Sequence, residues 1–461
     1  MKRTAWLMVG LFAVLVLSLP AAVAQADVAI QELPNVFDEF LIGGDLSVFF
    51  RYDYRPYFSE ATAFEGSEHP VTANNNWEEI FARLNFTAKK KFPWAEMEAK
   101  FSPIFMSTID QDVYGLVKDK AEVDFNKAYI AFKGMWDGKI STTIGMQDIQ
   151  LEKQFLIGLG RTQETAYWLL FNQSFPFGAR VDGDFGALKS TVFVARPGDY
   201  VAQTLEGEKD MYVTGVDAHY DFTETLYLFG GFYAKIDDTV PGTTGFVGQS
   251  LAQTDTYALD IGGDWTFGGF NLESEFVYEL GGVKFTNEQY DRKAFGCFAA
   301  AQYTFPVKWS PYAKFHFIYW PGDDLQDDGD IEEYDPMFLG WWGWDRWFIG
   351  EQIAEVWGLK TNTRKFIAEV GFYPVEPCQI QLIYIKHQLD EKYYPYGSLN
   401  PIPVTDTDFA DEFNLFMNWQ VNDFLFVHSG VGLASPNQAA KEVAGSNKTA
   451  LFGQIWLMFA F

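Results

Sequence analysis

Histidine and cysteine side chains can act as bases, nucleophiles and metal ligands, and this sequence contains five histidines and two cysteines. A hydrolase needs a nucleophile and a base within hydrogen-bonding distance of each other, but no G-x-S-x-G or H-E-x-x-H pattern accompanies any histidine. Cys297 and Cys378 stand far apart and form neither a CxxC nor a CxxCH motif. The sequence therefore predicts a protein that is not an enzyme and holds no cofactor. The histidines, each in a separate segment, are His69, His219, His316, His387 and His428.

A densely acidic stretch covers residues 323–336 (DDLQDDGDIEEYDP). Carboxylate oxygens are the ligands that hard divalent cations prefer, although the spacing here fails the EF-hand pattern. The favoured interpretation is a solvated external loop, and the alternative hypothesis is a divalent-cation site. That site would use Asp323, Asp324, Asp327, Asp328 and Asp330.

Charge and composition restrict the class of protein that carries these residues. The 62 acidic and 34 basic side chains give a formal charge of −28, which would repel a nucleic-acid backbone. A content of 18% aromatic residues is far too apolar for a disordered chain. At the same time, 21% charged residues is too polar for a helical membrane protein.

The first 26 residues have the form of a secretory signal peptide. Lys2 and Arg3 precede an apolar stretch at residues 5–19, and Ala24-Gln25-Ala26 reads as an A-x-A cleavage site. No later apolar stretch is long enough for a transmembrane helix, so a membrane protein with this sequence must be a β-barrel. We therefore expect a signal peptide at 1–26, a periplasmic segment at 27–43 and a transmembrane barrel at 44–461.

Apolar and polar residues alternate with a period of two along most of the chain, as in Leu46-Val48-Phe50-Tyr52 and Ala82-Leu84-Phe86-Ala88. Short links alternate with long ones, as in bacterial outer-membrane barrels, where periplasmic turns are short and external loops are long. The prediction is an all-β, antiparallel up-and-down barrel with eighteen strands. Their centres fall near residues 49, 83, 99, 128, 143, 181, 191, 216, 230, 261, 275, 299, 315, 368, 382, 416, 429 and 455.

Aromatic residues mark both the end of the chain and the expected membrane interfaces. The final strand alternates up to Phe459 and Phe461, which resembles the signal read by the outer-membrane assembly machinery. Aromatic residues near strand ends predict two interfacial girdles. These residues include Trp94, Trp136, Trp265, Trp309, Tyr319 and Trp320.

Four further tryptophans occur within residues 341–348 (WWGWDRWF). A sugar-stacking platform, a plug folded into the lumen and part of the upper girdle are all compatible with this spacing, and a girdle or plug is favoured. The four are Trp341, Trp342, Trp344 and Trp347.

Residues 126–196 carry a family resemblance. The segments NKAYIAFKG, ISTTIGMQDIQLEKQFLIG and FPFGARVDGDFGALKSTVFVARPGD, together with YDPMFLG at 334–340, resemble the alginate-export family of outer-membrane porins. The resemblance implies an eighteen-stranded monomeric barrel that passes a solute through its lumen. Two positions depart from the family pattern, because Met146 and Gln154 stand where family members often carry basic residues.

Alternation places more acids than bases on the lumen side of the predicted strands. The fourteen acids are Asp45, Asp53, Glu79, Glu96, Glu98, Asp182, Asp217, Asp260, Asp264, Glu273, Glu275, Glu279, Glu369 and Glu412. The nine bases are Arg51, Arg83, Lys89, Lys100, Arg180, Lys189, Lys235, Lys314 and Lys365. This ratio predicts a pore that favours cations or neutral solutes such as sugars over polyanions.

Twelve of these residues are the predicted pore lining. Glu273, Glu275 and Glu279 on one strand, with Asp260 and Asp264 on the next, form a predicted acidic wall, and Arg51, Arg83 and Lys100 form an opposing basic wall. A transverse field would cross the pore between them. Arg180, Asp182, Lys314 and Glu369 complete the predicted set.

We expect an outer-membrane channel for small hydrophilic solutes. The alternatives are a barrel sheath around a partner such as a multihaem cytochrome, and a polysaccharide exporter of the alginate-export type. The expected partners are outer-membrane lipid and lipopolysaccharide, the assembly machinery and the solute, with a monomer favoured over a trimer and no nucleic acid.

Overall fold

The structure is a computed structural model, and its described residues cover most of the predicted barrel. The predicted signal peptide, residues 1–26, lies outside them. They are residues 37–58, 61–62, 71–72, 74–111, 118–158, 174–197, 211–237, 253–284, 289–324, 329–337, 353, 357, 361–394 and 402–461.

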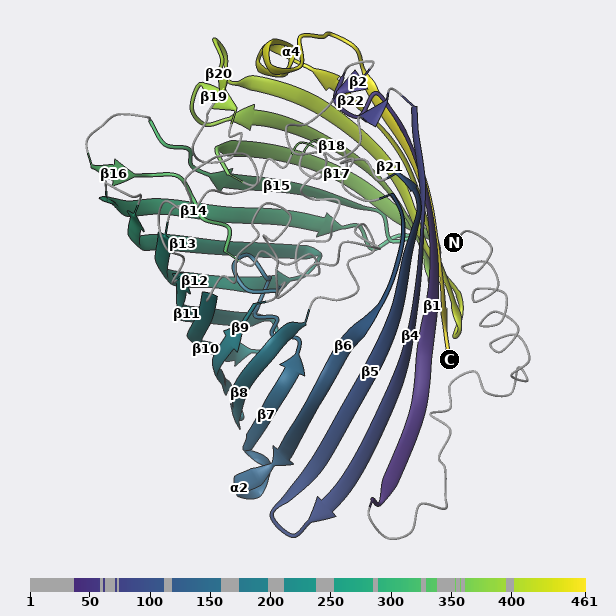
Figure 1. Ribbon diagram of the computed structural model, residues 1–461, viewed down its shortest axis with the longest axis vertical. Helices are drawn as coiled ribbons and strands as arrows, with labels where there is room; N and C mark the ends of the chain where they lie inside the picture. Colours follow the sequence, from purple (N-terminus) through teal and green to yellow (C-terminus); the bar gives the residue numbers. More distant parts are fainter. Residues whose placement is uncertain are drawn as a thin grey trace.

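Eighteen long strands in this part of the chain close into one antiparallel barrel (Figure 1), which confirms the predicted fold class and strand number. All eighteen predicted centres fall inside these strands. They are β1 (Glu39–Tyr54), β4 (Asn74–Phe92), β5 (Ala95–Gln111), β6 (Lys118–Gly134), β7 (Ile140–Gln147), β8 (Phe175–Phe185), β9 (Leu188–Arg196), β10 (Met211–Thr223), β11 (Leu226–Asp237), β12 (Gln253–Phe267), β13 (Phe270–Lys284), β14 (Gln289–Thr304), β15 (Tyr312–Trp320), β17 (Thr363–Val375), β18 (Cys378–Leu389), β21 (Asp408–Asn422), β22 (Leu425–Pro436) and β23 (Ala450–Ala460).

Smaller elements lie in the connections. None of the described helices is long and apolar enough to cross a bilayer. The strand β1 begins at Glu39, slightly before residue 44, where the barrel was expected to start. The smaller elements are β2 (Ala61–Thr62), β3 (Val71–Thr72), α2 (Met135–Gly138), β16 (Asp330–Ile331), β19 (Tyr393–Tyr394), β20 (Ile402–Pro403) and α4 (Gln438–Ala444).

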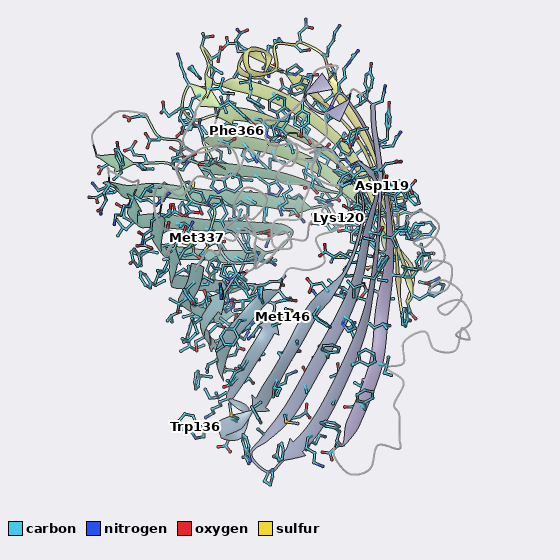
Figure 2. All side chains as sticks on the ribbon, in the orientation of Figure 1. Asp119, Lys120, Trp136, Met146, Met337 and Phe366 are labelled. Carbon is cyan, nitrogen blue, oxygen red and sulfur yellow. The ribbon has the colours of Figure 1, made fainter. Side chains whose placement is uncertain are left out.

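The two faces of each strand follow the predicted alternation. On β1, Phe50 and Tyr52 are exposed on the outside, whereas Phe49 and Arg51 are buried inside the barrel. Because side chains on successive strand positions point to opposite faces, the apolar outer set meets lipid and the inner set meets the lumen. Side chains therefore project from both surfaces of the wall (Figure 2).

Most of the predicted girdle tryptophans lie on the outer surface. Trp136 is 81% exposed on α2, at the lower end of the barrel in Figure 2, and Trp94, Trp265 and Trp309 are exposed as well. Trp320 is an exception, with no exposed surface. Its position on β15 alternates with that of Tyr319, so Trp320 points into the barrel and contributes to the interior instead of the girdle.

The barrel closes where β23 pairs with β1. Asp45 lies opposite Ala460, and the backbone groups of Gly44 and Phe461 exchange two hydrogen bonds, at 2.7 and 2.9 Å. A Cβ atom on Gly44 would collide with the carbonyl oxygen of Arg83 and lie 2.8 Å from the Phe461 ring. The closing seam therefore depends on the absence of a side chain at residue 44.

Gly44→Ala is expected to lower the free energy of unfolding by about 1–3 kcal/mol, because the added methyl group forces the seam apart. Heat-modifiable mobility in gel electrophoresis would measure this as a lower melting temperature of the folded band. Gly453→Ala is the matched control on the same strand pair, since its Cβ would meet no atom closer than 3.9 Å. Equal melting temperatures for the two variants would contradict the role of Gly44.

Candidate functional site

The twelve predicted pore-lining residues occupy inward-facing positions of the barrel strands, but solvent does not reach them equally. Arg83, Lys100, Arg180 and Lys314 are partly exposed, as are three of the acids. The other five are buried beneath side chains and loops. The partly exposed acids are Asp182, Asp264 and Glu273, and the buried residues are Arg51, Asp260, Glu275, Glu279 and Glu369.

Burial changes the ratio of acidic to basic side chains that are accessible from the lumen. Ten of the fourteen acids expected on the lumen side are buried, whereas only Arg51 and Lys365 are buried among the nine bases. Seven partly or fully exposed bases therefore face four such acids among these residues, all of which the structure describes. Counting residues on the inner face of each strand overestimated the acidity of the accessible wall.

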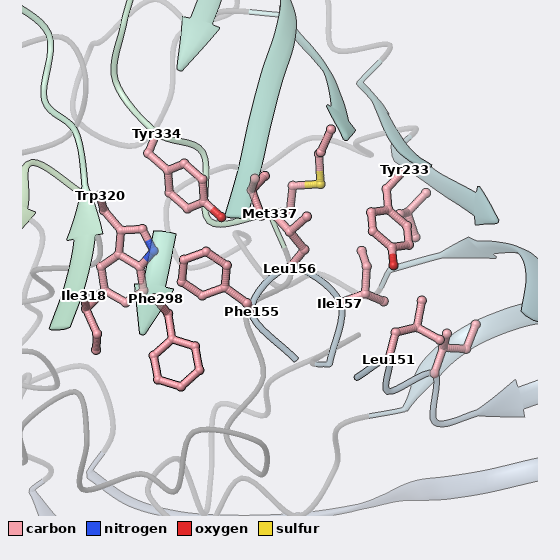
Figure 3. Close-up of a cluster of buried hydrophobic side chains, with 14 of the residues drawn as sticks. Leu151, Phe155, Leu156, Ile157, Tyr233, Phe298, Ile318, Trp320, Tyr334 and Met337 are labelled. Atoms are coloured by element: carbon pink, nitrogen blue, oxygen red, sulfur yellow. The ribbon is translucent and has the colours of Figure 1, made fainter. Parts of the chain in front are cut away.

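Part of the burial comes from residues 148–158, which follow β7 and fold into the barrel. Phe155 packs between two aromatic side chains, with its ring centroid 5.8 Å from that of Trp320 and 5.7 Å from that of Tyr334 (Figure 3). A loop that is exposed to water would not carry so many apolar side chains. We call residues 148–158 the inner loop. Its buried apolar residues are Ile149, Leu151, Phe155, Leu156 and Ile157.

Two charged residues hold the inner loop against the wall. The Nζ atom of Lys153 lies 3.2 Å from carboxylate oxygens of both Asp264 and Glu273. Glu152 lies 3.2 Å from Nδ1 of His219. Burial alone would lower the pKa of Lys153, but Glu273, Tyr227 and Asp264 together raise that pKa above its ordinary value. Lys153 therefore stays charged and neutralises part of the predicted acidic wall.

Residues 334–337 also fold inward and cover more of this wall. Asp335 pairs with Lys235, accepts a 2.8 Å hydrogen bond from the Thr256 hydroxyl and donates its backbone N–H to Glu279. Tyr334 joins the same apolar cluster as Phe155. Glu279 is thereby separated from the solvent in the lumen.

The predicted basic wall also differs from its expected form at Arg51. The guanidinium of Arg51 binds both carboxylate oxygens of Asp53 at 2.8–2.9 Å, and neither side chain has exposed surface. Arg51 therefore serves a buried ion pair and does not face the lumen solvent.

A chain of hydrogen bonds continues from Arg51 around the wall through buried and partly buried side chains. The Arg51 guanidinium donates to Gln454, and the Gln454 amide donates to His428, each over 3.0 Å. His428 then donates to Asn418 at 2.7 Å, Asn418 to Gln381 at 3.0 Å, and Gln381 to Glu369 at 2.9 Å. These partners place the proton of His428 on Nδ1, a tautomer that is assigned from the hydrogen bonds. Every hydrogen bond in the chain is then donated in the same direction, from Arg51 toward Glu369. We call this chain the polar belt, and it ties β1 to β17 across the closing seam.

Three basic side chains lie near one another on the wall formed by β4, β5 and β6. Lys100 on β5 is partly exposed and forms no ion pair with any residue that the structure describes. Lys127, a diagonal neighbour on β6, lies 2.6 Å from Asp148, and Arg83 on β4 lies 2.8 Å from the buried Asp45. Two cations thus carry a partner, whereas Lys100 presents its charge to the lumen.

Sequence reasoning missed Lys127, Asp148 and Lys153. The strand β6 has a register shift, in which Lys127 pairs with Ser102 but Phe125 pairs with Pro103, so Asn126 is an extra residue. A bulge of this kind breaks simple alternation. For the inner loop, the apolar residues within LEKQFLIG were a usable signal, because they contradict a solvated external loop.

The structure describes only some residues of the other predicted sites. Among these residues, no three potential metal ligands converge on one point, and Asp330 pairs instead with Lys293 at 2.8 Å. Asp327 and Asp328 of the acidic stretch, as well as Trp341, Trp342, Trp344 and Trp347, lie outside the described part of the chain. Phe459 faces lipid opposite Leu46 on β1, and Phe461 lies at the seam.

Comparisons with known proteins agree with this architecture. The sequence model of the alginate export family matches residues 98–454. No curated protein sequence matches the chain significantly.

Solved structures of outer-membrane porins share the fold. A BenF-like porin from Pseudomonas fluorescens Pf-5 superposes with a TM-score of 0.55 at 8% identity, covering 92% of this chain and 100% of the porin. OccAB4 from Acinetobacter baumannii gives 0.52 at 11% identity, covering 93% of this chain and 99% of OccAB4. OccK5 (OpdH) from Pseudomonas aeruginosa gives 0.51 at 10% identity, covering 91% and 98%.

Proposed function

This chain belongs to the alginate export family, and from that premise we propose that it forms an outer-membrane channel through which small hydrophilic solutes diffuse, with a preference for anionic over cationic solutes. The observation that carries the charge preference is Lys100, which is partly exposed and forms no ion pair with a described residue. It lies beside Lys127 and Arg83, whereas ten of the fourteen acids expected in the lumen are buried. A fixed charge at a narrow point of a pore raises the local concentration of oppositely charged solutes. This replaces the cation preference expected from residue counts alone.

The inner loop favours a channel over a sheath around a partner protein. Its apolar side chains and Lys153 fill part of the barrel interior. An inserted protein would have to displace this loop and bury those apolar groups elsewhere. A constricted, partly polar passage is suited instead to small solutes.

Export of an acidic polysaccharide is the second candidate, favoured by the family match and by the same three basic residues. Blocking of the ionic current distinguishes the two functions. A channel for small solutes is blocked by monomeric acids, whereas an exporter is blocked at much lower concentrations by acidic oligosaccharides. Catalysis has no part in either proposal.

Export and assembly complete the proposal. The signal peptide at 1–26 would be cleaved after Ala26, and residues 27–38, before β1, would lie in the periplasm. Phe459 and Phe461 would be read by the assembly machinery, and the folded monomer would contact lipid and lipopolysaccharide.

Lys100→Glu is expected to reverse the selectivity of the channel, because it replaces a partly exposed cation by a carboxylate beside Lys127. The chloride-to-potassium permeability ratio, obtained from the reversal potential of the refolded barrel in a planar bilayer under a potassium chloride gradient, should fall about threefold or more. Lys293→Glu makes the same change of charge on the outer face, where Lys293 pairs with Asp330. An unchanged ratio in Lys100→Glu, or cation selectivity of the wild type, would contradict the proposed preference.

A further inference from the structure

Asp264 on β12 and Glu273 on β13 lie directly opposite each other on the inner face of the wall. Two carboxylates in this position repel each other, and such a cross-strand pair is stable only with a cation between them. The chain supplies that cation from the inner loop, since Nζ of Lys153 is 3.2 Å from each carboxylate.

Other side chains fix the surroundings of this ammonium group. Tyr227 on β11 lies opposite Asp264, and its ring stacks on His219 with centroids 4.3 Å apart. Asn271 donates a 2.7 Å hydrogen bond to the other oxygen of Asp264, which fixes the orientation of that carboxylate. Two oriented carboxylates beside an aromatic ring are the groups that recognise an alkylammonium ion.

Two further carboxyl groups lie beyond the two that Lys153 contacts. Asp260 and Glu275 continue the same face of β12 and β13 and are more than nine-tenths buried. Each has a carboxylate oxygen, Oδ1 of Asp260 and Oε2 of Glu275, with no hydrogen-bond partner in the described part of the chain. Four carboxyl groups therefore line this face of β12 and β13, and Lys153 contacts two of them.

We propose that Asp264, Glu273 and Tyr227 form a binding site for primary alkylammonium groups, and that Lys153 of the inner loop occupies this site as a tethered, displaceable competitor. A solute amine that takes the place of Lys153 removes one of the ionic contacts that hold the inner loop. Binding at the site does not require conduction, so the inference goes beyond the proposed channel.

Isothermal titration of the refolded barrel in detergent with 1,5-diaminopentane tests the site, with 1,5-pentanediol as the uncharged probe. Lys153→Gln removes the internal competitor and is expected to bind the diamine at least about tenfold more tightly than the wild type. Lys314→Gln is the matched control: Lys314 also contacts Glu273, at 3.4 Å, but from the wall, so Lys153 still occupies the site. Lys153→Gln with Asp264→Asn and Glu273→Gln is expected to lose the binding.

Equal diamine affinity in the wild type and Lys153→Gln would overturn the proposal, and so would binding that survives loss of both carboxylates. A second measurement uses only the wild-type barrel, so it tests the proposal even if a variant does not fold. Backbone hydrogen exchange of residues 149–157 is expected to accelerate with saturating diamine and not with pentanediol, and unchanged exchange would also overturn the proposal. A barrel that binds the diamine but passes no current would contradict the channel and leave the amine site standing.

Discussion

Replacing Arg51 by methionine is expected to lower the free energy of unfolding by about 3–5 kcal/mol, because it leaves the carboxylate of Asp53 buried without its partner. The two side chains have no exposed surface, and three hydrogen bonds of 2.8–2.9 Å join them. The change also removes the donor at the start of the polar belt, where Arg51 binds Gln454 across the seam. Denaturant unfolding of the refolded barrel, followed by tryptophan fluorescence, would measure the loss.

Two controls separate the buried charge from a general effect of removing arginine. Arg180→Met breaks a partly exposed pair with Asp182, whose side chains are 28% and 31% exposed, and should cost about 1 kcal/mol or less. Arg51→Met combined with Asp53→Leu removes both buried charges and should recover most of the lost stability. If Arg51→Met and Arg180→Met lower the free energy of unfolding by the same amount, the burial of the Arg51–Asp53 pair does not add to the stability of the seam.

Phe155→Ala is expected to release the inner loop and to raise the single-channel conductance about twofold or more. The ring of Phe155 is fully buried between Trp320 and Tyr334, and removal of a buried phenyl group typically costs about 3–5 kcal/mol of packing. Because continuous backbone pairing holds the barrel strands, this loss favours the detached state of the loop over a rearrangement of the strands. Conductance in a planar bilayer measures the outcome.

The lipid-facing Phe315 provides the matched control for this prediction. It lies on β15 beside the inward-facing His316, and it is 51% exposed on the outer surface. Phe315→Ala removes the same number of atoms without touching the lumen, so its conductance should equal that of the wild type. A Phe155→Ala channel with wild-type conductance would show that the loop does not limit the current.

The strands could be predicted because the signal for them is local. Alternation along β1 and β4, together with short turns such as Phe92 to Ala95, depends on neighbouring residues and needs no knowledge of distant contacts. The direction of each side chain follows from the same pattern, which is why all twelve predicted pore residues occupy inward-facing positions. The bulge at Asn126 marks the limit of this reasoning, since alternation fails beyond an inserted residue.

The sequence could not predict which inward-facing residues are buried or paired, because burial and pairing depend on contacts between segments far apart in sequence. Nothing near Glu273 in the chain indicates that Lys153 will neutralise it, and nothing near Glu279 indicates that residues 334–337 will cover it. Alternation along the strands also gives no information on the direction in which the connecting residues 148–158 and 334–337 fold. Buried loops therefore decide which of the predicted charges a solute can meet.

The pairing of β23 with β1 has a consequence for how the molecule forms. The first and last barrel strands complete each other, with Asp45 opposite Ala460, so neither has both hydrogen-bonding partners until the whole sheet is assembled. Contacts between such distant parts of a chain form slowly, since the intervening segment must first be ordered. Unpaired strand edges cannot remain in lipid, where no water satisfies them. Closure is therefore the last step of assembly, and a chain interrupted before β23 has no stable folded form in the membrane.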